Sequence, residues 1–477
     1  MKTVKDTLWF LFSAAFGPGL FFLLLPFWTR ILDKEEFALI GILRTIEGIG
    51  IAFLVLGFAG AVTRYYHEAK SPRDFASFFT SSLVIGGVIG VFIVTACCGI
   101  ILGIPDLLAP LPAGFVVIAV IAIYLMSLPE SMVFGSWMTA ERAAACACFK
   151  ISNAVVSTFL QLGFVLASTD RLQGWVTGYF FGAVYICASS IFFARREGWL
   201  NGAIRRHHAW YALAFGLPLV PHVLSNWILR AADRFILLKL VSVESLAQYT
   251  LAASLSIGLA IIVNAFGQAW TPRFFRFAGE GGQESKIRAY YYSLIYLTGM
   301  LTIVSCFVLN YAGGFTFGHS YAPSWRFFVP LAGATLFLAI YQYFVGFLFY
   351  EKRTRLIPII TGVAALVNIG LNLYFIPTYG VVSAGYTTLA SYGVMAVGAY
   401  VISARVGRLK LNVLPTFVWV TIVIVASHLV VGPVNRWQAA TFSLAVIILL
   451  GVLGVFVLSI RTHGAVIRSA VLKHKVS

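Results

Sequence analysis

Polar side chains recur at helical spacing inside an apolar stretch between residues 213 and 252. His222, Asn226 and Arg230 are four residues apart. Asp233 and Arg234 follow Arg230 by three and four residues. Side chains at these spacings share one face of a helix. Hydrocarbon does not hold such a stripe, whereas a cavity lined by protein or water does. The spacing therefore predicts a substrate-binding cavity, although a solvated helix end would also explain Arg234.

A second charged pair, Arg44 and Glu47, lies three residues apart within another apolar stretch. A charge at the centre of a bilayer costs roughly 2.5–3.5 kcal/mol on insertion scales, so each one requires a reason. In one interpretation the two charges neutralise each other and stabilise their helix. In the other, Arg44 binds a substrate phosphate through its planar guanidinium fork, and Glu47 orients it or carries a proton.

Glu130 is the third intramembrane carboxyl of interest. It follows Pro129 and has no basic residue at helical spacing along its own segment. A carboxyl in hydrocarbon without a cation suits proton uptake and release, so we predict a role for Glu130 in proton coupling. A position near the membrane surface, where the side chain would have no such role, is the alternative.

Composition decides which elements must position these residues. Sixty per cent of the 477 residues are hydrophobic and only 11% are charged. A soluble domain does not bury so much apolar surface, and unbroken apolar runs of about 20 residues predict membrane-spanning helices rather than a barrel. The net charge of +17 therefore reflects basic cytoplasmic loops rather than nucleic-acid binding. The six cysteines have no metal-ligand spacing, so we predict neither a metal site nor disulfides.

The apolar runs predict an all-α membrane protein with fourteen transmembrane helices. Most Lys and Arg residues fall in alternate connections, on the same side as the N-terminus, which predicts that both termini are cytoplasmic. Arg30 lies on the opposite side, at the end of the first run, and joins the predicted cavity residues. The predicted spans are 8–29, 37–60, 78–102, 113–135, 146–167, 173–193, 209–229, 247–270, 289–311, 327–350, 356–376, 381–404, 413–432 and 439–460.

A sequence echo suggests that the chain contains an internal repeat. TRILDKEEFALIGIL from Thr29 resembles DRFILLKLVSVESLAQYTLAASL from Asp233, and each contains basic and apolar residues, a short turn and a helix of small residues. We therefore predict two pseudo-symmetric six-helix bundles, residues 1–207 and 208–408, followed by two further helices and a cytoplasmic tail in 409–477. Proline and glycine residues predict interruptions of the first, fourth and seventh spans.

Four motifs occur in order along the chain: TRILDKEEFALIGIL at 29–43, GLPLVPHVLSNWILRAADRFIL at 216–237, SVESLAQYTLAASL at 242–255 and NLYFIPTYGVVSAGYTTLASY at 372–392. Together they resemble the polysaccharide-flippase branch of the multidrug/oligosaccharidyl-lipid/polysaccharide exporter superfamily. The resemblance implies two six-helix bundles that face a central cavity. It also implies export of undecaprenyl-pyrophosphate-linked oligosaccharide across the bacterial inner membrane, for O-antigen, capsule or exopolysaccharide synthesis.

Several functions fit such a chain. The leading hypothesis is a flippase for the lipid-linked oligosaccharide, working by alternating access beside the polymerase and glycosyltransferases of its pathway. A lipid II flippase of the same superfamily is the second, and a drug or cation antiporter the third, disfavoured because basic residues outnumber acidic ones at membrane depth. An enzyme is not expected, because the outer loops are short and carry no catalytic cluster. No phosphate-binding loop for ATP is present and no cofactor is predicted, so coupling would use an H+ or Na+ gradient.

Overall fold

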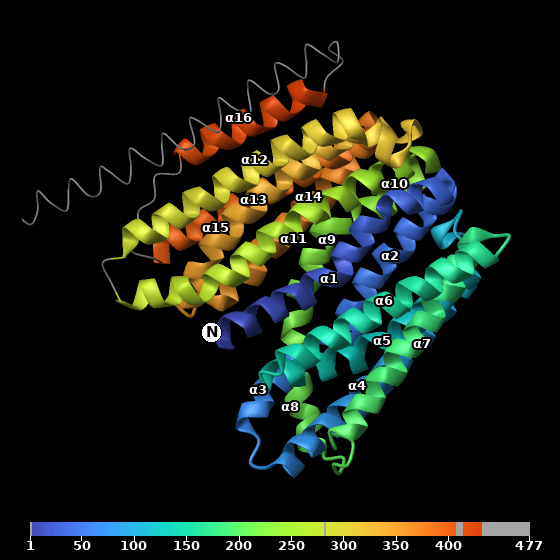
Figure 1. Cartoon of the computed structure of the whole chain (residues 1–477), viewed down its shortest axis with the longest axis vertical. Coiled ribbons are helices and arrows are strands. Elements are labelled where there is room, and N and C mark those ends of the chain that lie inside the picture. The colour runs from blue at the N-terminus through green and yellow to red at the C-terminus, as the bar shows by residue number, and fades with distance from the viewer. Residues whose placement is uncertain (1, 281–282, 407–413, 432–477) are drawn as a thin grey trace, which may run out of the picture. The chain divides into compact units, whose positions relative to one another are not determined.

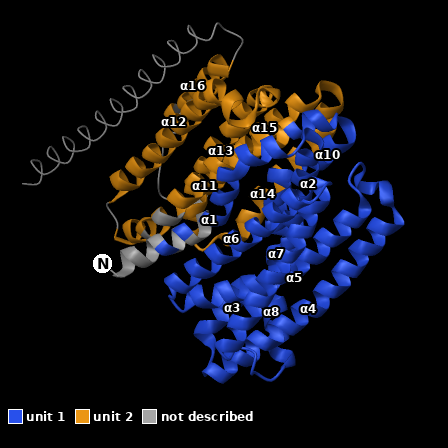
Figure 2. Ribbon diagram, turned by 45° about the vertical axis from the view of Figure 1, so that its right-hand side comes forward, with its two compact units in different colours: residues 1–247 blue, residues 248–477 orange. Residues whose placement is uncertain are grey.

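The computed structural model describes residues 2–280, 283–406 and 414–431. Every regular element in these three segments is a helix (Figure 1). The chain forms two compact units, residues 1–247 and residues 248–477, which Figure 2 distinguishes by colour. The predicted all-helical class is therefore confirmed for the described residues.

Unit 1 is built around α5 (Ala113–Thr139), which packs against α2, α3, α4 and α7. In turn α7 contacts α6, and α6 contacts α1. The remaining elements of unit 1 are α1 (Lys2–Ile31), α2 (Lys34–Val55), α3 (Phe58–Glu68), α4 (Pro72–Gly103), η1 (Pro105–Leu108), α6 (Ala143–Ala167), α7 (Arg171–Arg196), α8 (Arg206–Gly216), η2 (Leu217–Leu219), α9 (Val220–Ala231), α10 (Asp233–Leu240) and the first turn of α11 (Val243–Glu280).

Unit 2 has α13 (Ser324–Tyr350) at its centre, packed against α12, α15 and α16. Most of the length of α13 is buried by these neighbours, because its apolar side chains point in all directions around the helix. Besides the rest of α11, unit 2 contains α12 (Glu284–Phe317), η3 (His319–Tyr321), η4 (Thr354–Leu356), α14 (Ile357–Tyr379), α15 (Val381–Val406) and α16 (Leu414–Val431).

Eleven helices among the described residues are long and apolar enough to cross a membrane. They coincide with the second to twelfth predicted spans. The predicted spans 8–29 and 413–432 correspond to the shorter apolar helices Phe16–Ile31 and Val418–Val431. The predicted span 439–460 lies outside the described residues. The chain is thus a multi-pass membrane protein, while the count of fourteen spans stays a prediction.

The predicted helix interruptions are right in one place and wrong in two. In the seventh span the helix breaks at Leu217–Leu219, beside Pro218, and restarts as α9. In contrast, α1 continues through Pro18 and Pro26, and α5 continues through Pro129. Membrane helices tolerate proline because neighbouring groups satisfy the freed carbonyl, so proline by itself does not predict a break.

One break has no proline and was missed. The second predicted span divides into α2 and α3 at Leu56 and Gly57, both of which have positive φ angles. This break packs directly against the break in the seventh span. A Cβ atom added to Gly216 would lie 1.8 Å from the carbonyl oxygen of Leu56, and one added to Gly57 would lie 2.8 Å from the Cα of Gly216. Two discontinuous helices of unit 1 therefore meet at their breaks, where only glycine fits.

We expect Gly216→Ala to destabilise the protein by about 1–3 kcal/mol, because the methyl group overlaps a backbone carbonyl that has no flexible side chain to move. Thermal unfolding of the purified protein measures the effect. Gly99→Ala is the matched control, since a Cβ at Gly99 of α4 meets nothing within 4 Å. Equal unfolding temperatures for the two variants would disprove the close approach of the breaks.

The two helix starts of the predicted internal repeat have the same local design. Asp33 caps α2 by accepting a hydrogen bond from the Glu36 backbone N–H at 2.7 Å. Ser242 accepts one from the Ser245 backbone N–H at 3.3 Å, at the start of α11.

The compact units divide after Ala247 rather than at 207/208, because α8 packs on α3 and α4, and α9 packs on α2. The repeat boundary at 207/208 therefore stays a prediction.

Candidate functional site

The predicted polar stripe begins on α9, a helix of unit 1. The Asn226 side chain donates to the His222 carbonyl at 2.9 Å and lies 3.2 Å from the His222 imidazole. One turn later, Arg230 Nε donates to the Asn226 carbonyl at 3.1 Å. The spacing therefore places these three side chains in succession on one helix, as predicted. Arg230 is exposed, whereas His222 and Asn226 are half-buried.

Asp233 and Arg234 belong to the next helix, α10, and are buried, with exposed fractions of 4% and 6%. The Asp233 carboxylate accepts a hydrogen bond from the Arg234 backbone N–H at 2.8 Å. Arg234 Nη1 donates to Thr45 Oγ1 of α2 at 3.2 Å. The Nε and Nη2 atoms of Arg234 are buried and have no hydrogen-bond partner among the described residues. A solvated helix end, the alternative interpretation of Arg234, is thereby excluded.

Arg44 and Glu47 lie on the part of α2 that Arg234 reaches. The guanidinium carbon of Arg44 is 3.5 Å from the centre of the Phe21 ring of α1, a cation–π geometry. Arg44 and Glu47 attract each other, and Arg234 is close enough to Arg44 to repel it. Glu47 also interacts electrostatically with Tyr179 of α7 and Glu130 of α5. Thus α2, α5, α7 and α10 bring these charges into one cluster.

Trp227 of α9 fixes the distance between α9 and this part of α2. Its indole Nε1 donates to the Thr45 carbonyl at 3.0 Å. Its ring lies so close to Gly48 that a Cβ atom there would be 2.9 Å from Trp227 Cδ1. Trp227 therefore helps to position Arg44, Glu47 and Thr45, the partner of Arg234.

Glu130 has a cationic partner, so the expectation of a carboxyl without one is wrong. Lys150 of α6 donates to Glu130 Oε1 at 2.9 Å, and the Asn153 side-chain amide lies 3.3 Å from the same oxygen. Ser189 of α7 in turn donates to Asn153 Oδ1 at 3.2 Å. The partner was missed because it comes from a neighbouring helix. Three helices thus share one polar network, in which Lys150 balances Glu130.

The cations at the start of α2 and the end of α10 connect elements of unit 1. Lys34 forms an ion pair with Glu244 at the start of α11. Lys239 donates to the Asp106 carbonyl of η1 at 2.7 Å. Arg30, also predicted as a cavity residue, is exposed at the end of α1. Lys34, Lys150 and Lys239 therefore each bind a partner on another element. Arg44 and Arg234 lie close together in the cluster on α2, α5, α7 and α10, so this cluster is the candidate anion site.

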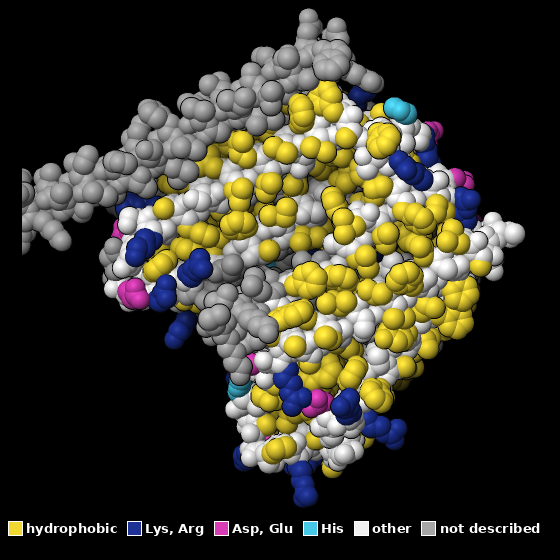
Figure 3. Space-filling view, viewed as in Figure 1, with side chains coloured by type: hydrophobic (Ala, Val, Ile, Leu, Met, Phe, Trp, Pro, Cys, Tyr) yellow, Lys and Arg dark blue, Asp and Glu magenta, His cyan; other side chains and the backbone are white. Residues whose placement is uncertain are grey.

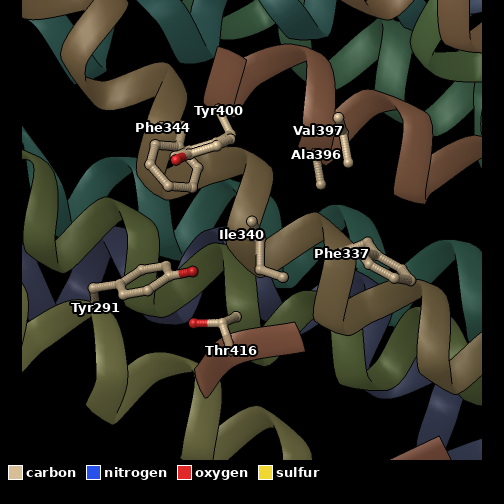
Figure 4. A pocket seen from close by; sticks show the side chains of 8 residues that line it. All are labelled: Tyr291, Phe337, Ile340, Phe344, Ala396, Val397, Tyr400 and Thr416. Carbon is tan, nitrogen blue, oxygen red and sulfur yellow. The ribbon is translucent and has the colours of Figure 1, made fainter. Parts of the chain in front are cut away.

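Unit 2 offers surroundings of a different kind. An apolar pocket lies between α12, α13, α15 and α16, and in Figure 4 the hydroxyls of Tyr291 and Thr416 point toward one another across it. The remaining lining residues shown in Figure 4 are Phe337, Ile340, Phe344, Ala396, Val397 and Tyr400. Because a charged group is costly to bury in such surroundings, this pocket is a poor site for a phosphate.

Amide side chains in unit 2 pair with one another. Asn372 donates to Asn368 Oδ1 at 3.0 Å, and the Thr387 hydroxyl donates to Asn372 Oδ1. Gln342 of α13 donates to Asn264 Oδ1 of α11. The contacts between α13 and α11 and between α15 and α14 hold membrane helices together.

Comparisons with known proteins place this arrangement in context. A sequence model of the family described as "Polysaccharide biosynthesis protein" matches residues 3–278. No curated protein sequence matches the chain. Among solved structures, the lipid II flippase MurJ in an inward closed conformation matches with a TM-score of 0.72 and 13% identity, over 96% of this chain and 99% of that one. An inward-facing multidrug resistance MATE family transporter of the MOP superfamily matches with a TM-score of 0.62 and 14% identity, over 81% and 94%. The fold is therefore that of membrane flippases and exporters.

Proposed function

We propose that this chain, which belongs to the family of polysaccharide biosynthesis proteins, is a flippase for undecaprenyl-pyrophosphate-linked oligosaccharide. It would carry this intermediate across the bacterial inner membrane for O-antigen, capsule or exopolysaccharide synthesis. Alternating access around a basic cavity would expose the head group first to one side and then to the other, while the polyprenyl tail stays in lipid. Polysaccharide polymerase and glycosyltransferases of the same pathway are its proposed partners.

The observation that carries this proposal is the buried guanidinium group of Arg234. Its Nη1 is bound by Thr45, and its Nε and Nη2 are donors without partners among the described residues. Removing a cation from water without satisfying its hydrogen bonds costs several kcal/mol. A protein retains such a group where a ligand supplies the missing hydrogen-bond acceptors. Phosphate oxygens suit the planar guanidinium fork better than any neutral ligand does.

The neighbouring Arg44 favours a ligand with two phosphate groups. Because Arg44 and Arg234 repel each other, an anion that contacts both would relieve the repulsion and gain two attractions. The diphosphate that links a glycan to a polyprenyl chain has this charge distribution. A cationic drug would instead be repelled by both arginines, which disfavours a drug or cation antiporter.

Lipid II also carries a polyprenyl diphosphate, so the two arginines do not separate the leading proposal from a lipid II flippase. Purified protein in proteoliposomes should translocate a short-chain polyprenyl-diphosphate oligosaccharide, measured by its accessibility to a glycan-binding protein on the far side. Lipid II and a cationic dye, tested in the same vesicles, should move far more slowly. Faster movement of lipid II would replace the proposal by the second function, and movement of the dye alone would reject both.

The predicted orientation, with both termini cytoplasmic, can be tested by labelling. In a background without the six native cysteines, Ser242→Cys should react with an impermeant thiol reagent applied outside the cell. Gln283→Cys should not react until the membrane is opened. These positions flank the long helix α11, so they are expected on opposite sides. The reverse pattern would invert the orientation derived from the loop charges.

A further inference from the structure

One end of unit 1, at the α3–α4, α5–α6 and α7–α8 connections, is densely basic. In Figure 3, dark-blue side chains gather at this end, where Figure 1 labels α3 and α8. The acidic residues there are largely engaged. Glu197 is 2.6 Å from Arg142 Nη1, and Glu68 accepts from Arg64 at 2.8 Å. Six further cations, all exposed, define what we term the basic platform: Lys70, Arg73, Arg195, Arg196, Arg205 and Arg206.

The platform is held rigidly by the loop between α7 and α8. Thr80 of α4 donates to the Trp199 carbonyl at 2.9 Å, and Ser81 of α4 accepts from the Arg205 backbone N–H at 2.8 Å. At Gly202 the loop touches α4 so closely that a Cβ atom would lie 2.1 Å from the Ser77 nitrogen. The ring of Trp199 is buried in the aromatic core of this end. The arginines of the loop therefore present their charges from a fixed backbone.

A second feature accompanies the charge. Ile204, immediately before Arg205 and Arg206, has an exposed fraction of 65%, and Trp210 one turn beyond them has 60%. Apolar and indole side chains beside arginines are typical of segments that lie in the headgroup region of a bilayer. An acidic protein surface would pair with the arginines but would offer no hydrocarbon to Ile204.

We propose that the basic platform binds the head groups of anionic phospholipids, with Ile204 and Trp210 inserted among the acyl chains. Guanidinium groups form bidentate hydrogen bonds with phosphodiester oxygens. Juxtamembrane clusters of four to eight basic residues attract anionic lipid head groups electrostatically. The bound lipid bridges the α3–α4 and α7–α8 connections and stabilises unit 1. This site is separate from the proposed diphosphate site, which involves Arg44 and Arg234.

Thermal unfolding of the purified full chain in detergent tests the proposal. Phosphatidylglycerol should raise the unfolding temperature more than phosphatidylcholine does, because a ligand bound only by the folded state stabilises it. In the triple variant Arg195→Gln, Arg205→Gln, Arg206→Gln, most of this extra shift should be lost. High salt should weaken the shift in the wild type, since exposed charges are screened.

The matched control removes three exposed cations from the connection between α13 and α14 in unit 2, with Lys352→Gln, Arg353→Gln and Arg355→Gln. It should keep the full phosphatidylglycerol shift. If the platform variant folds poorly, the triple lysine variant at the same three positions keeps the charge and should retain the shift. An unchanged shift in the glutamine platform variant, or an equal loss in the control, would overturn the proposal. The basic platform would then be explained by an acidic protein partner, or by its effect on membrane topology alone.

Discussion

Arg234→Met should abolish export and at the same time raise the unfolding temperature of the protein. The two effects have one cause. Arg234 is buried with two unpartnered guanidinium nitrogens, so replacing it with an apolar side chain of similar volume removes a desolvation penalty. The same replacement removes the donors that the diphosphate would complete. Losing one partner of a buried charged hydrogen bond costs about 2 kcal/mol or more, which is roughly a 30-fold loss of affinity or more.

Export of lipid-linked oligosaccharide in proteoliposomes measures the first effect and thermal unfolding measures the second. Arg171→Met is the matched control, because Arg171 is an exposed arginine of the same unit and should change neither quantity strongly. Arg234→Lys should also impair export. The ammonium group of lysine lacks the planar fork of a guanidinium, with which Arg234 would bind Thr45 and a phosphate at the same time. Wild-type export by Arg234→Met would reject Arg234 as a ligand of the diphosphate.

The second large effect concerns Glu130. We expect Glu130→Gln to lose gradient-dependent export and Glu130→Asp to keep part of it. In the structure Lys150 and Asn153 hold the Glu130 carboxylate. A proton that neutralises this carboxylate would break the ion pair with Lys150 and free α5 from α6. Glutamine imitates the protonated form permanently, so the transporter should no longer respond to a proton gradient.

Glu130→Gln also leaves Lys150 without its counter-charge, which by itself could harm folding. The double variant Glu130→Gln, Lys150→Gln separates the two causes, because it restores charge balance without restoring a carboxyl group. It should recover the membrane level of the protein but not the dependence of export on the proton gradient. If the double variant exports normally and still responds to pH, the pair is structural. Coupling would then involve Na+ at another site, or polymer synthesis would draw the substrate across.

Tertiary contacts changed the meaning of several residues that the sequence singled out. Lys150 is a basic residue within a predicted span, but its partner is Glu130 of a neighbouring helix. Lys239, another basic residue outside the predicted cytoplasmic loops, donates a hydrogen bond to a backbone carbonyl of η1. Thr45, Tyr179 and Trp227 did not stand out, because a threonine, a tyrosine or a tryptophan near the end of a span is common. Their positions beside Arg44, Glu47 and Arg234 depend on how α2, α7, α9 and α10 pack.

The amino-acid sequence by itself determined that this is a helical membrane protein, and where most of its helices run. Long apolar runs and the cost of burying an unpaired backbone leave no other solution in hydrocarbon. The sequence also identified the charged residues, because a charge inside an apolar run is visible without any neighbour. Which charges have partners was decided only by the tertiary structure. Glu130 and Lys150 are 20 residues apart, Thr45 and Arg234 are 189 apart, and the helix breaks at Gly57 and Gly216 meet across a similar separation. No local spacing encodes such contacts, because they depend on which helices pack side by side.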